Sequence, residues 1–229
     1  MKHITLLFAA LLLSACHIHT DESRRNKLLR FAASHPVAAK AIGLKGEDSI
    51  NITSNSTRFA EKTGLDNKAN GEGRGTQVNA FRHALWQAAV ASRFGTDIAK
   101  KVGDANEDDA SIRERKTKYF SRFAADQAVD LRNNRIGRTI GAANPEANIK
   151  VLAQSVLTHF HKEGLWTAKP VKEKGYTYWM ISQSKLSKAE FQSAQSKINL
   201  LNLNGFTDEE QEKYDADKAA NSFKNNIFK

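Results

Sequence analysis

The sequence predicts an all-α protein with a single globular domain. Most segments repeat their apolar residues with the 3.6-residue period of a helix, the three prolines are sparse, and β-branched residues seldom cluster. The chain has 229 residues, 40% of them hydrophobic and 26% charged, so it can bury a core. No internal repeat or low-complexity run divides it. We therefore expect one helical domain over residues 23–229, built around a buried central helix.

The first fifteen residues are typical of a signal peptide and not of a folded domain. Lys2 precedes an apolar stretch, residues 4–13, that is too short to span a bilayer. Residues 13–16 then read Leu-Ser-Ala-Cys, which matches the lipobox of bacterial lipoproteins. In a lipobox the cysteine is acylated and becomes the first residue of the mature protein. We predict a cleaved lipoprotein signal peptide over 1–15, then acylated Cys16 and a polar tether over 16–22. The alternative is an ordinary signal peptide with an incidental cysteine.

Predicted location and net charge together define the expected partners. Each methylene of an acyl chain that is buried in a bilayer stabilises membrane attachment by about 0.8 kcal/mol. His17, and not an aspartate, follows the cysteine, which is the usual pattern for outer-membrane sorting in Gram-negative bacteria. The formal net charge of +10 favours acidic partners. We expect a lipid-anchored protein of the cell envelope, most simply in the outer membrane, whose partners are the membrane and either a protein or an anionic envelope component. Nucleic acid is not an expected partner.

Short helices are expected in the first third of the mature chain. Periodicity predicts helices over 27–33 and 36–42, the second of them stopped by Gly43. A third helix is predicted over 50–62, although its Asn, Ser and Thr residues are weak helix formers. Residues 66–75 are polar and rich in glycine, so they are expected to form a loop.

The stretch from Val78 to Phe94 predicts the central helix. Residues 84–91 are apolar nearly all round, which is typical of a helix buried on every side. Gly95 is expected to end this helix. Thr96 is expected to cap the next one, which runs to about Glu107.

The second half of the chain carries further helix signals. A helix is predicted over 120–133, with Gly137 near its end, and Asn144 with Pro145 suit the start of another helix that Gly164 closes. Two capping boxes, at 187–190 and 207–210, predict the last two helices. The segment 175–182 is the one stretch that resembles a strand or extended loop.

Arg82 and His83 are the first candidates for chemistry. They are ionisable residues on a helix otherwise made of core residues. A buried charge without a partner costs several kcal/mol, so both side chains require polar partners from elsewhere in the chain. The pair can be a hydrogen-bonded structural feature, or His83 can be a catalytic or ligand-binding group. The sequence leaves both open.

Two polar clusters could supply those partners. Asp104 and Glu107 share one helix face, and so do Asp130, Asn133 and Asn134. We predict that these clusters converge on Arg82 and His83, with Arg82 paired to a carboxylate. Solvated helix faces are the alternative explanation for both clusters.

The sequence assigns no metal ion or cofactor, although the helix face of Asp104 and Glu107 could also bind a metal or supply a general acid or base. His159 and His161 lie two residues apart, so on a helix they point about 200° away from each other and cannot chelate one ion. The single cysteine excludes an internal disulfide framework and a Cys-cluster zinc site. No phosphate-binding loop, HExxH, GxSxG or GxGxxG motif is present.

The chain resembles an uncharacterised bacterial domain family in three segments: NAFRHALWQA, DANE and DLRNNRIGR. The family pattern is FRHA-aromatic-W, D-A-H-E and D-L-H-N-N-x-x-G-R. The three segments span 79–138, and the similarity is expected over about 50–204. Members look like lipoproteins, or like C-terminal parts of large secreted proteins of the polymorphic-toxin type. The resemblance implies one polar pocket lined by Arg82, His83, Asp104, Glu107, Asp130, Asn133, Asn134 and Arg138.

Two departures from the family pattern bear on activity. Asn106 and Arg132 stand where the family tends to have histidine. Neither Asn nor Arg exchanges a proton near neutral pH. Either the motif histidines have no chemical role, or this chain is a degenerate member of a toxin-like family.

Two classes of function follow from the sequence. The first is a membrane-anchored lipoprotein whose helical domain binds a partner without catalysis. The second is an envelope hydrolase or toxin-like enzyme in which His83 works with Glu107 or Asp130. The missing histidines, and the absence of a known nucleophile motif, favour the first.

Overall fold

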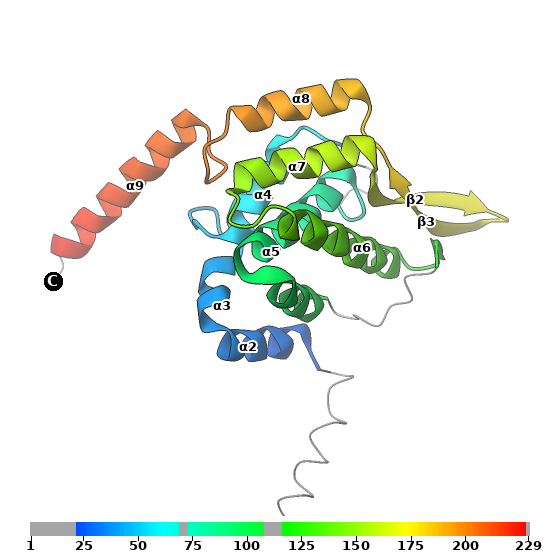
Figure 1. The fold of residues 1–229 in the computed structure, drawn as a ribbon, viewed down its shortest axis with the longest axis horizontal. Helices are drawn as coiled ribbons and strands as arrows, with labels where there is room; N and C mark the ends of the chain where they lie inside the picture. The colour runs from blue at the N-terminus through cyan, green and yellow to red at the C-terminus, as the bar shows by residue number, and fades with distance from the viewer. Residues whose placement is uncertain (1–21, 69–72, 108–115, 228–229) are drawn as a thin grey trace, which may run out of the picture.

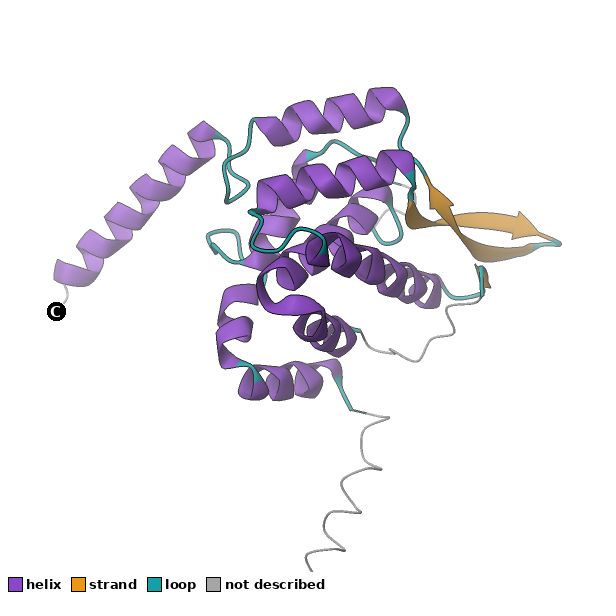
Figure 2. Cartoon of the chain, in the orientation of Figure 1, coloured by secondary structure: helices purple, strands orange, loops and turns teal. Residues whose placement is uncertain are grey.

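The computed structural model describes residues 22–68, 73–107 and 116–227, with side chains up to residue 221. Helices dominate these residues, and a small antiparallel sheet projects from one side of the helical body (Figures 1 and 2). A single globular, helix-rich domain therefore agrees with the prediction. The all-α assignment is wrong in part, because the sheet has three strands.

The first three described helices lie close to their predicted positions. Helix α2 covers Arg24–Ser34, α3 covers Pro36–Ile42 and α4 covers Ile52–Lys62. Pro36 occupies the first turn of α3, where its missing N–H is not needed. The side chain of Asn51 caps α4 by accepting a hydrogen bond from the Ser54 backbone N–H at 2.8 Å.

Helix α5 (Gln77–Asn106) is broken at Gly95, as the sequence predicted. Gly95 has φ 84° and ψ 163°, a conformation that is essentially restricted to glycine. A straight helix rises 1.5 Å per residue, which would place residues 83 and 107 about 36 Å apart. Ligand atoms of His83 and Glu107 instead lie within 4.8 Å of each other. The chain therefore turns back at Gly95, and this reversal builds the candidate site.

Helix α6 (Arg122–Ala142) packs along α5 and continues past its predicted end near residue 133. Gly137 does not terminate it. A Cβ atom at Gly137 would lie 2.2 Å from the carbonyl oxygen of Ala84, and one at Gly141 would lie 2.3 Å from that of Ala88. These glycines therefore allow the backbones of α5 and α6 to approach closely.

Helix α7 covers Ile149–Lys162, so the predicted start at Asn144 and Pro145 is wrong. The Asn144 side chain donates to the carbonyl of Ile140 at 2.9 Å, which completes the end of α6. Asn148 caps α7 instead, and accepts from the Val151 N–H at 3.0 Å. Gly164, with φ 100°, follows the end of α7 as predicted.

The sheet consists of β1 (Lys118–Tyr119), β2 (Leu165–Glu173) and β3 (Tyr176–Ser184), in the order β1-β3-β2. Strand β3 matches the predicted extended segment, whereas β2 was not predicted. Pro170 and the charged residues around it obscured β2. Because β2 is an edge strand, a proline can be accommodated there. Lys174 and Gly175 join the two strands, and both have the positive φ of a tight hairpin turn.

Helices α8 (Lys188–Asn199) and α9 (Asp208–Ile227) start where the capping boxes predicted. The Glu190 carboxylate accepts from the Ser187 backbone N–H at 2.7 Å, and the Glu190 N–H donates to Ser187 Oγ at 3.2 Å. Helix α9 leads away from the helical body (Figure 1). Among the helices of the described residues, none combines the length and apolar character needed to cross a membrane.

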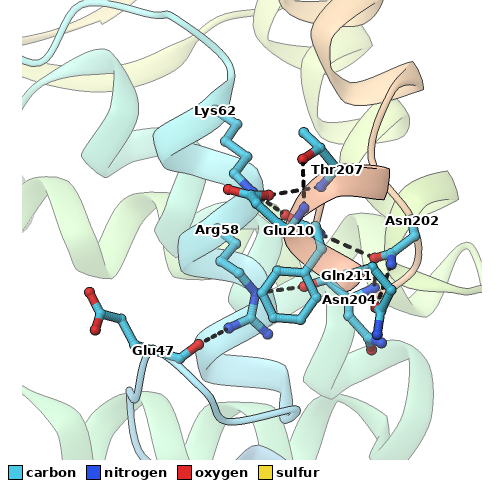
Figure 3. Close-up of polar contacts among 10 residues, drawn as sticks. Glu47, Arg58, Lys62, Asn202, Asn204, Thr207, Glu210 and Gln211 are labelled. Carbon is cyan, nitrogen blue, oxygen red and sulfur yellow. Dashed lines mark hydrogen bonds and ion pairs between the residues drawn. The ribbon is translucent and has the colours of Figure 1, made fainter. Parts of the chain in front are cut away.

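Arg58 of α4 fastens the loop between α8 and α9 to the body (Figure 3). Its Nε donates to the Asn204 carbonyl at 2.7 Å and its Nη1 to the Glu47 carbonyl at 3.1 Å. The guanidinium also lies 4.2 Å from the centre of the Phe206 ring. Burial lowers the pKa of Arg58, although nearby acidic groups oppose this. Lys62, one turn later on α4, contacts the same loop.

Within the described ranges, the core forms three clusters of buried apolar side chains. The first joins α4, α5, α7 and α8 and contains Phe59, Phe81, Leu85, Leu152, Leu157, Phe160 and Ile198. The second lies between α2, α3 and α5 and contains Phe31, Ile42, Val90 and Val102. The third lies where the sheet meets α6 and contains Tyr119, Val129 and Ile181. The central helix is therefore buried largely as predicted.

Candidate functional site

A cavity of about 400 Å³ opens where α2, α4, the two halves of α5 and the first half of α6 meet. This volume is within the range of small-molecule sites. Its wall contains the cations Arg24, Lys45, Arg74 and Arg82. It also contains the acidic groups Glu107, Asp126 and Asp130, together with His83. Ionisable side chains from five separate parts of the chain therefore converge on one cavity.

His83 contacts α6 through both ring nitrogens. Its Nδ1 lies 3.2 Å from Asn134 Oδ1, and its Nε2 lies 3.4 Å from Asp130 Oδ2. The side chain is 11% exposed. Burial, followed by the positive charge of Arg82, lowers the pKa of His83 to about 3. The imidazole is therefore neutral at physiological pH.

Two buried aspartates stand side by side on α6. Burial raises the pKa of Asp130 well above its ordinary value, and the charges of Asp126 and Glu107 add to this. Burial also raises the pKa of Asp126, opposed by Arg74, whose Nε lies 3.9 Å from it. Asn79 Nδ2 donates to Asp130 at 2.8 Å and to Asp126 at 3.4 Å. One amide thus bridges both carboxyl groups.

Arg82 reaches the carboxyl groups through Asn79. Its guanidinium donates to Asn79 Oδ1, and Asn79 donates in turn to Asp130. In the part of the chain that the structure describes, Arg82 has no direct ion pair with a carboxylate. The predicted Arg82–carboxylate pair is wrong, because a neutral amide lies between the charges.

These groups form an acid–base pair and a possible ligand set. A neutral imidazole faces a carboxyl group whose pKa is raised, so a proton shared by the pair is held by Asp130 in preference to His83. One carboxylate oxygen of Glu107 lies close to both His83 and Asp130. Ligand atoms of His83, Glu107 and Asp130 all lie within 4.8 Å of one another.

Three of the candidate pocket residues lie elsewhere. Asp104 is partly exposed and pairs with Lys100, one turn earlier on the same helix. Asn133 is fully buried against the backbone of Trp166 in β2. Arg138 donates to Gln87 at 3.1 Å, further along the α5–α6 contact. The structure therefore does not place Asp104, Asn133 or Arg138 in the cavity wall.

Asn134 and the two departures from the family pattern take different positions. Asn134 is not among the residues that line the cavity, but its Oδ1 contacts His83 Nδ1 and orients the imidazole ring. Asn106 lines the cavity and accepts from Arg24 at 2.7 Å. Arg132 lies outside the cavity lining: it donates to the Lys116 carbonyl at 3.0 Å, and its guanidinium stacks on the Trp166 ring at 4.1 Å. Only the substitution at Asn106 therefore removes a histidine from the cavity.

The sequence did not identify Asp126, Arg74 or Trp86 as site residues. Asp126 could have been found, because it lies four residues before Asp130 and so shares its helix face. Arg74 lies within the predicted polar loop over 66–75, and its sequence context gave no signal of a site residue. Trp86 was expected to be fully buried, but it is only partly buried and lines the cavity, with Nε1 donating to Thr53 Oγ1 at 3.1 Å. Cys16 lies outside the described residues.

One comparison with known proteins identifies a family. A protein-family model described as "Domain of unknown function (DUF6973)" matches residues 34–164, which is more than half of the chain and includes all the cavity residues named above except Arg24. Neither the search of curated proteins nor the search of solved structures finds a match. The chain belongs to the uncharacterised DUF6973 family.

Proposed function

We propose that this chain is a lipid-anchored protein of the cell envelope whose helical domain binds a small anionic molecule in the cavity. The observation that carries the proposal is the cavity itself, whose wall holds four basic side chains together with three acidic groups and His83. Anionic groups favour such a wall, because Arg donates in a fixed fork that matches phosphate and carboxylate. The predicted envelope location makes lipid headgroups and cell-wall fragments the natural candidates.

The first two helices suit a position close to an anionic membrane. They follow the predicted tether directly, and α2 carries four basic residues: Arg24, Arg25, Lys27 and Arg30. Nearby, Leu29, Val37 and Leu44 are exposed by 58%, 75% and 81%. Basic residues near a membrane surface each gain about 1 kcal/mol from anionic lipids. This surface supports the proposed anchoring, because it would add to the attraction of the acyl chains.

Replacement of Cys16 with serine is expected to move the protein out of the membrane fraction, or to block its processing, because the acyl chains would have no attachment point. Fractionation and mass spectrometry of the N-terminus would measure this. His17→Asp provides a matched control, since it should stay membrane-bound and move from the outer to the inner membrane. Membrane partition and an N-terminus unchanged by Cys16→Ser would contradict the lipoprotein proposal.

A second candidate is a hydrolase or toxin-like enzyme that uses His83 with Asp130 or Glu107. The observation that favours it is the pairing of a neutral imidazole with a carboxyl group whose pKa is raised by burial, inside the cavity. The position of Arg132 outside the cavity also weakens the case for lost activity. The motif resemblance, which implies relatives of the polymorphic-toxin type, is in line with this candidate.

Binding in the cavity is tested by Arg82→Gln, which removes a charge from its wall. Phosphatidylglycerol and purified cell-wall muropeptides serve as probes, and native mass spectrometry reports their binding. A hydrogen bond from a charged group contributes about 1.5–3 kcal/mol, so affinity should fall roughly ten- to hundredfold. Lys188→Gln makes the same charge change on exposed α8 and should have no effect. Failure of the wild-type protein to bind either probe would count against the proposal, and cleavage of a probe would favour the enzyme.

A further inference from the structure

We infer that His83, Glu107 and Asp130 form a binding site for a divalent transition-metal ion on the cavity wall. The inference concerns the cavity of the proposed function, but it stands on these three residues alone and requires no organic ligand. It departs from the sequence-based expectation, which assigned no metal. His159 and His161, whose spacing rules out a chelating pair, are not part of this site.

The geometry of the three ligand atoms fits one ion. They lie within 4.8 Å of one another. Metal–nitrogen and metal–oxygen bonds of about 2.0–2.2 Å put two ligand atoms at most about 4.4 Å apart. Small side-chain adjustments would therefore close the site. The three residues come from the first half of α5, the end of its second half, and α6, so the reversal at Gly95 is what brings them together.

Neighbouring hydrogen bonds orient the ligands for this purpose. With His83 Nδ1 donating to Asn134 Oδ1 at 3.2 Å, the lone pair of Nε2 is directed toward Asp130. Asn79 donates to Asp130 Oδ1 at 2.8 Å, which leaves Oδ2 facing His83. Metal-binding histidines almost always have such a partner on the second nitrogen, and ligating carboxylates are hydrogen-bonded as well. Both features are present here.

The charge at the three ligand atoms favours a cation, even though the cavity wall as a whole also carries four basic side chains. Asp126, Asp130 and Glu107 are buried near one another, with 9%, 6% and 5% of their surfaces exposed. Within the described residues, the only basic side chain at ion-pair distance from Asp130 is His83. Arg82 is separated from Asp130 by Asn79. Asp126 already has Arg74 at 3.9 Å, so a divalent ion would mainly offset the repulsion between Glu107 and Asp130.

The donor set indicates the class of ion. One imidazole nitrogen and two carboxylate oxygens suit Zn²⁺ or Mn²⁺, whereas Ca²⁺ needs six to eight oxygen ligands. Three protein ligands leave coordination positions open toward the cavity, as in catalytic metal sites. An ion held there would act as a Lewis acid on a molecule bound in the cavity.

The test uses the full chain in detergent, stripped of metal with a chelator and titrated calorimetrically with Zn²⁺, Mn²⁺, Mg²⁺ or Ca²⁺. We expect one Zn²⁺ or Mn²⁺ per chain and much weaker binding of the other two ions. His83→Gln, Glu107→Gln and Asp130→Asn should each weaken binding at least tenfold, and Asn134→Ala should weaken it ten- to hundredfold. Asp104→Asn and His161→Gln, which alter residues outside the site, should bind as the wild type does. Absence of binding, or equal binding by all variants, would overturn the inference.

A spectroscopic measurement keeps the test decisive if a variant folds poorly. Mn²⁺ bound to the wild-type protein should show electron–nuclear coupling to a histidine nitrogen in pulsed electron paramagnetic resonance. His83→Gln should remove this coupling, whereas a coupling retained in that variant would place the ion elsewhere. Binding of phosphatidylglycerol and muropeptides, measured with chelator present, separates this inference from the proposed function, because either can fail alone.

Discussion

Replacement of Gly137 with alanine is expected to lower the free energy of unfolding by about 3 kcal/mol or more. The added Cβ would lie 2.2 Å from the carbonyl oxygen of Ala84 and 2.9 Å from Cβ of Gln87. The nearer contact is backbone, so the clash can be relieved only if α5 and α6 move apart. Overpacking of a core usually costs about 1–3 kcal/mol, and more where the backbone must shift. Urea unfolding at equilibrium measures the change.

The sign of the Gly137 result is itself informative. In an uncrowded helix, alanine is more stable than glycine by about 1 kcal/mol, so a loosely packed α6 would be stabilised by this substitution. Thr139→Ala is the matched control: Thr139 is exposed on the same helix, and its substitution should change stability by less than about 0.5 kcal/mol. Stabilisation by Gly137→Ala would disprove the close contact between the two helices.

The sequence predicted most helices because local signals set their ends. The caps at Asn51 and Ser187 and the break at Gly95 depend on residues within one or two turns, so they can be recognised without the fold. Strand β2 has no such signal: Pro170 and exposed charged residues hide its alternation, and its strand conformation depends on pairing with β3. The start of α7 was misplaced because Asn144 caps the preceding helix instead.

The candidate site could be predicted only in outline. Arg82 and His83 on an apolar helix require polar partners, and this reasoning led to Glu107 and Asp130. Composition and spacing do not reveal how sharply the chain reverses direction at Gly95. Glu107 reaches the cavity because of this reversal. The same lack of three-dimensional information placed Asn133 with the pocket residues, because its helix face resembles that of Asp130.

Asn133 instead joins α6 to the sheet. Its Nδ2 donates to the Trp166 carbonyl at 2.9 Å, and its Oδ1 accepts from the Trp166 N–H at 2.9 Å. The amide therefore pairs with the backbone of β2 as another strand would. Asn133 is fully buried, so water cannot replace either hydrogen bond if the side chain changes.

Asn133→Asp is expected to cost about 3–5 kcal/mol of stability at neutral pH, although it preserves the shape of the side chain. The carboxylate would lose the donor to the Trp166 carbonyl and would be a buried charge without a partner. The pKa of this aspartate would rise above its unfolded value of about 3.9. The loss of stability therefore grows as the pH rises above about 3.9. At lower pH the loss fades, because the protonated acid can again donate to the Trp166 carbonyl. Asn221→Asp, on an exposed face of α9, should be neutral.

Measurements of unfolding at about pH 4.5 and pH 7.5 separate these outcomes. In the folded fraction, binding of Mn²⁺ and of the cavity probes should match the wild type, because Asn133 does not line the cavity. A variant that stays stable but loses binding would show that Asn133 acts in the pocket, as the motif resemblance implies. A large loss of stability at the higher pH, with binding intact, would establish Asn133 as the residue through which α6 holds the sheet.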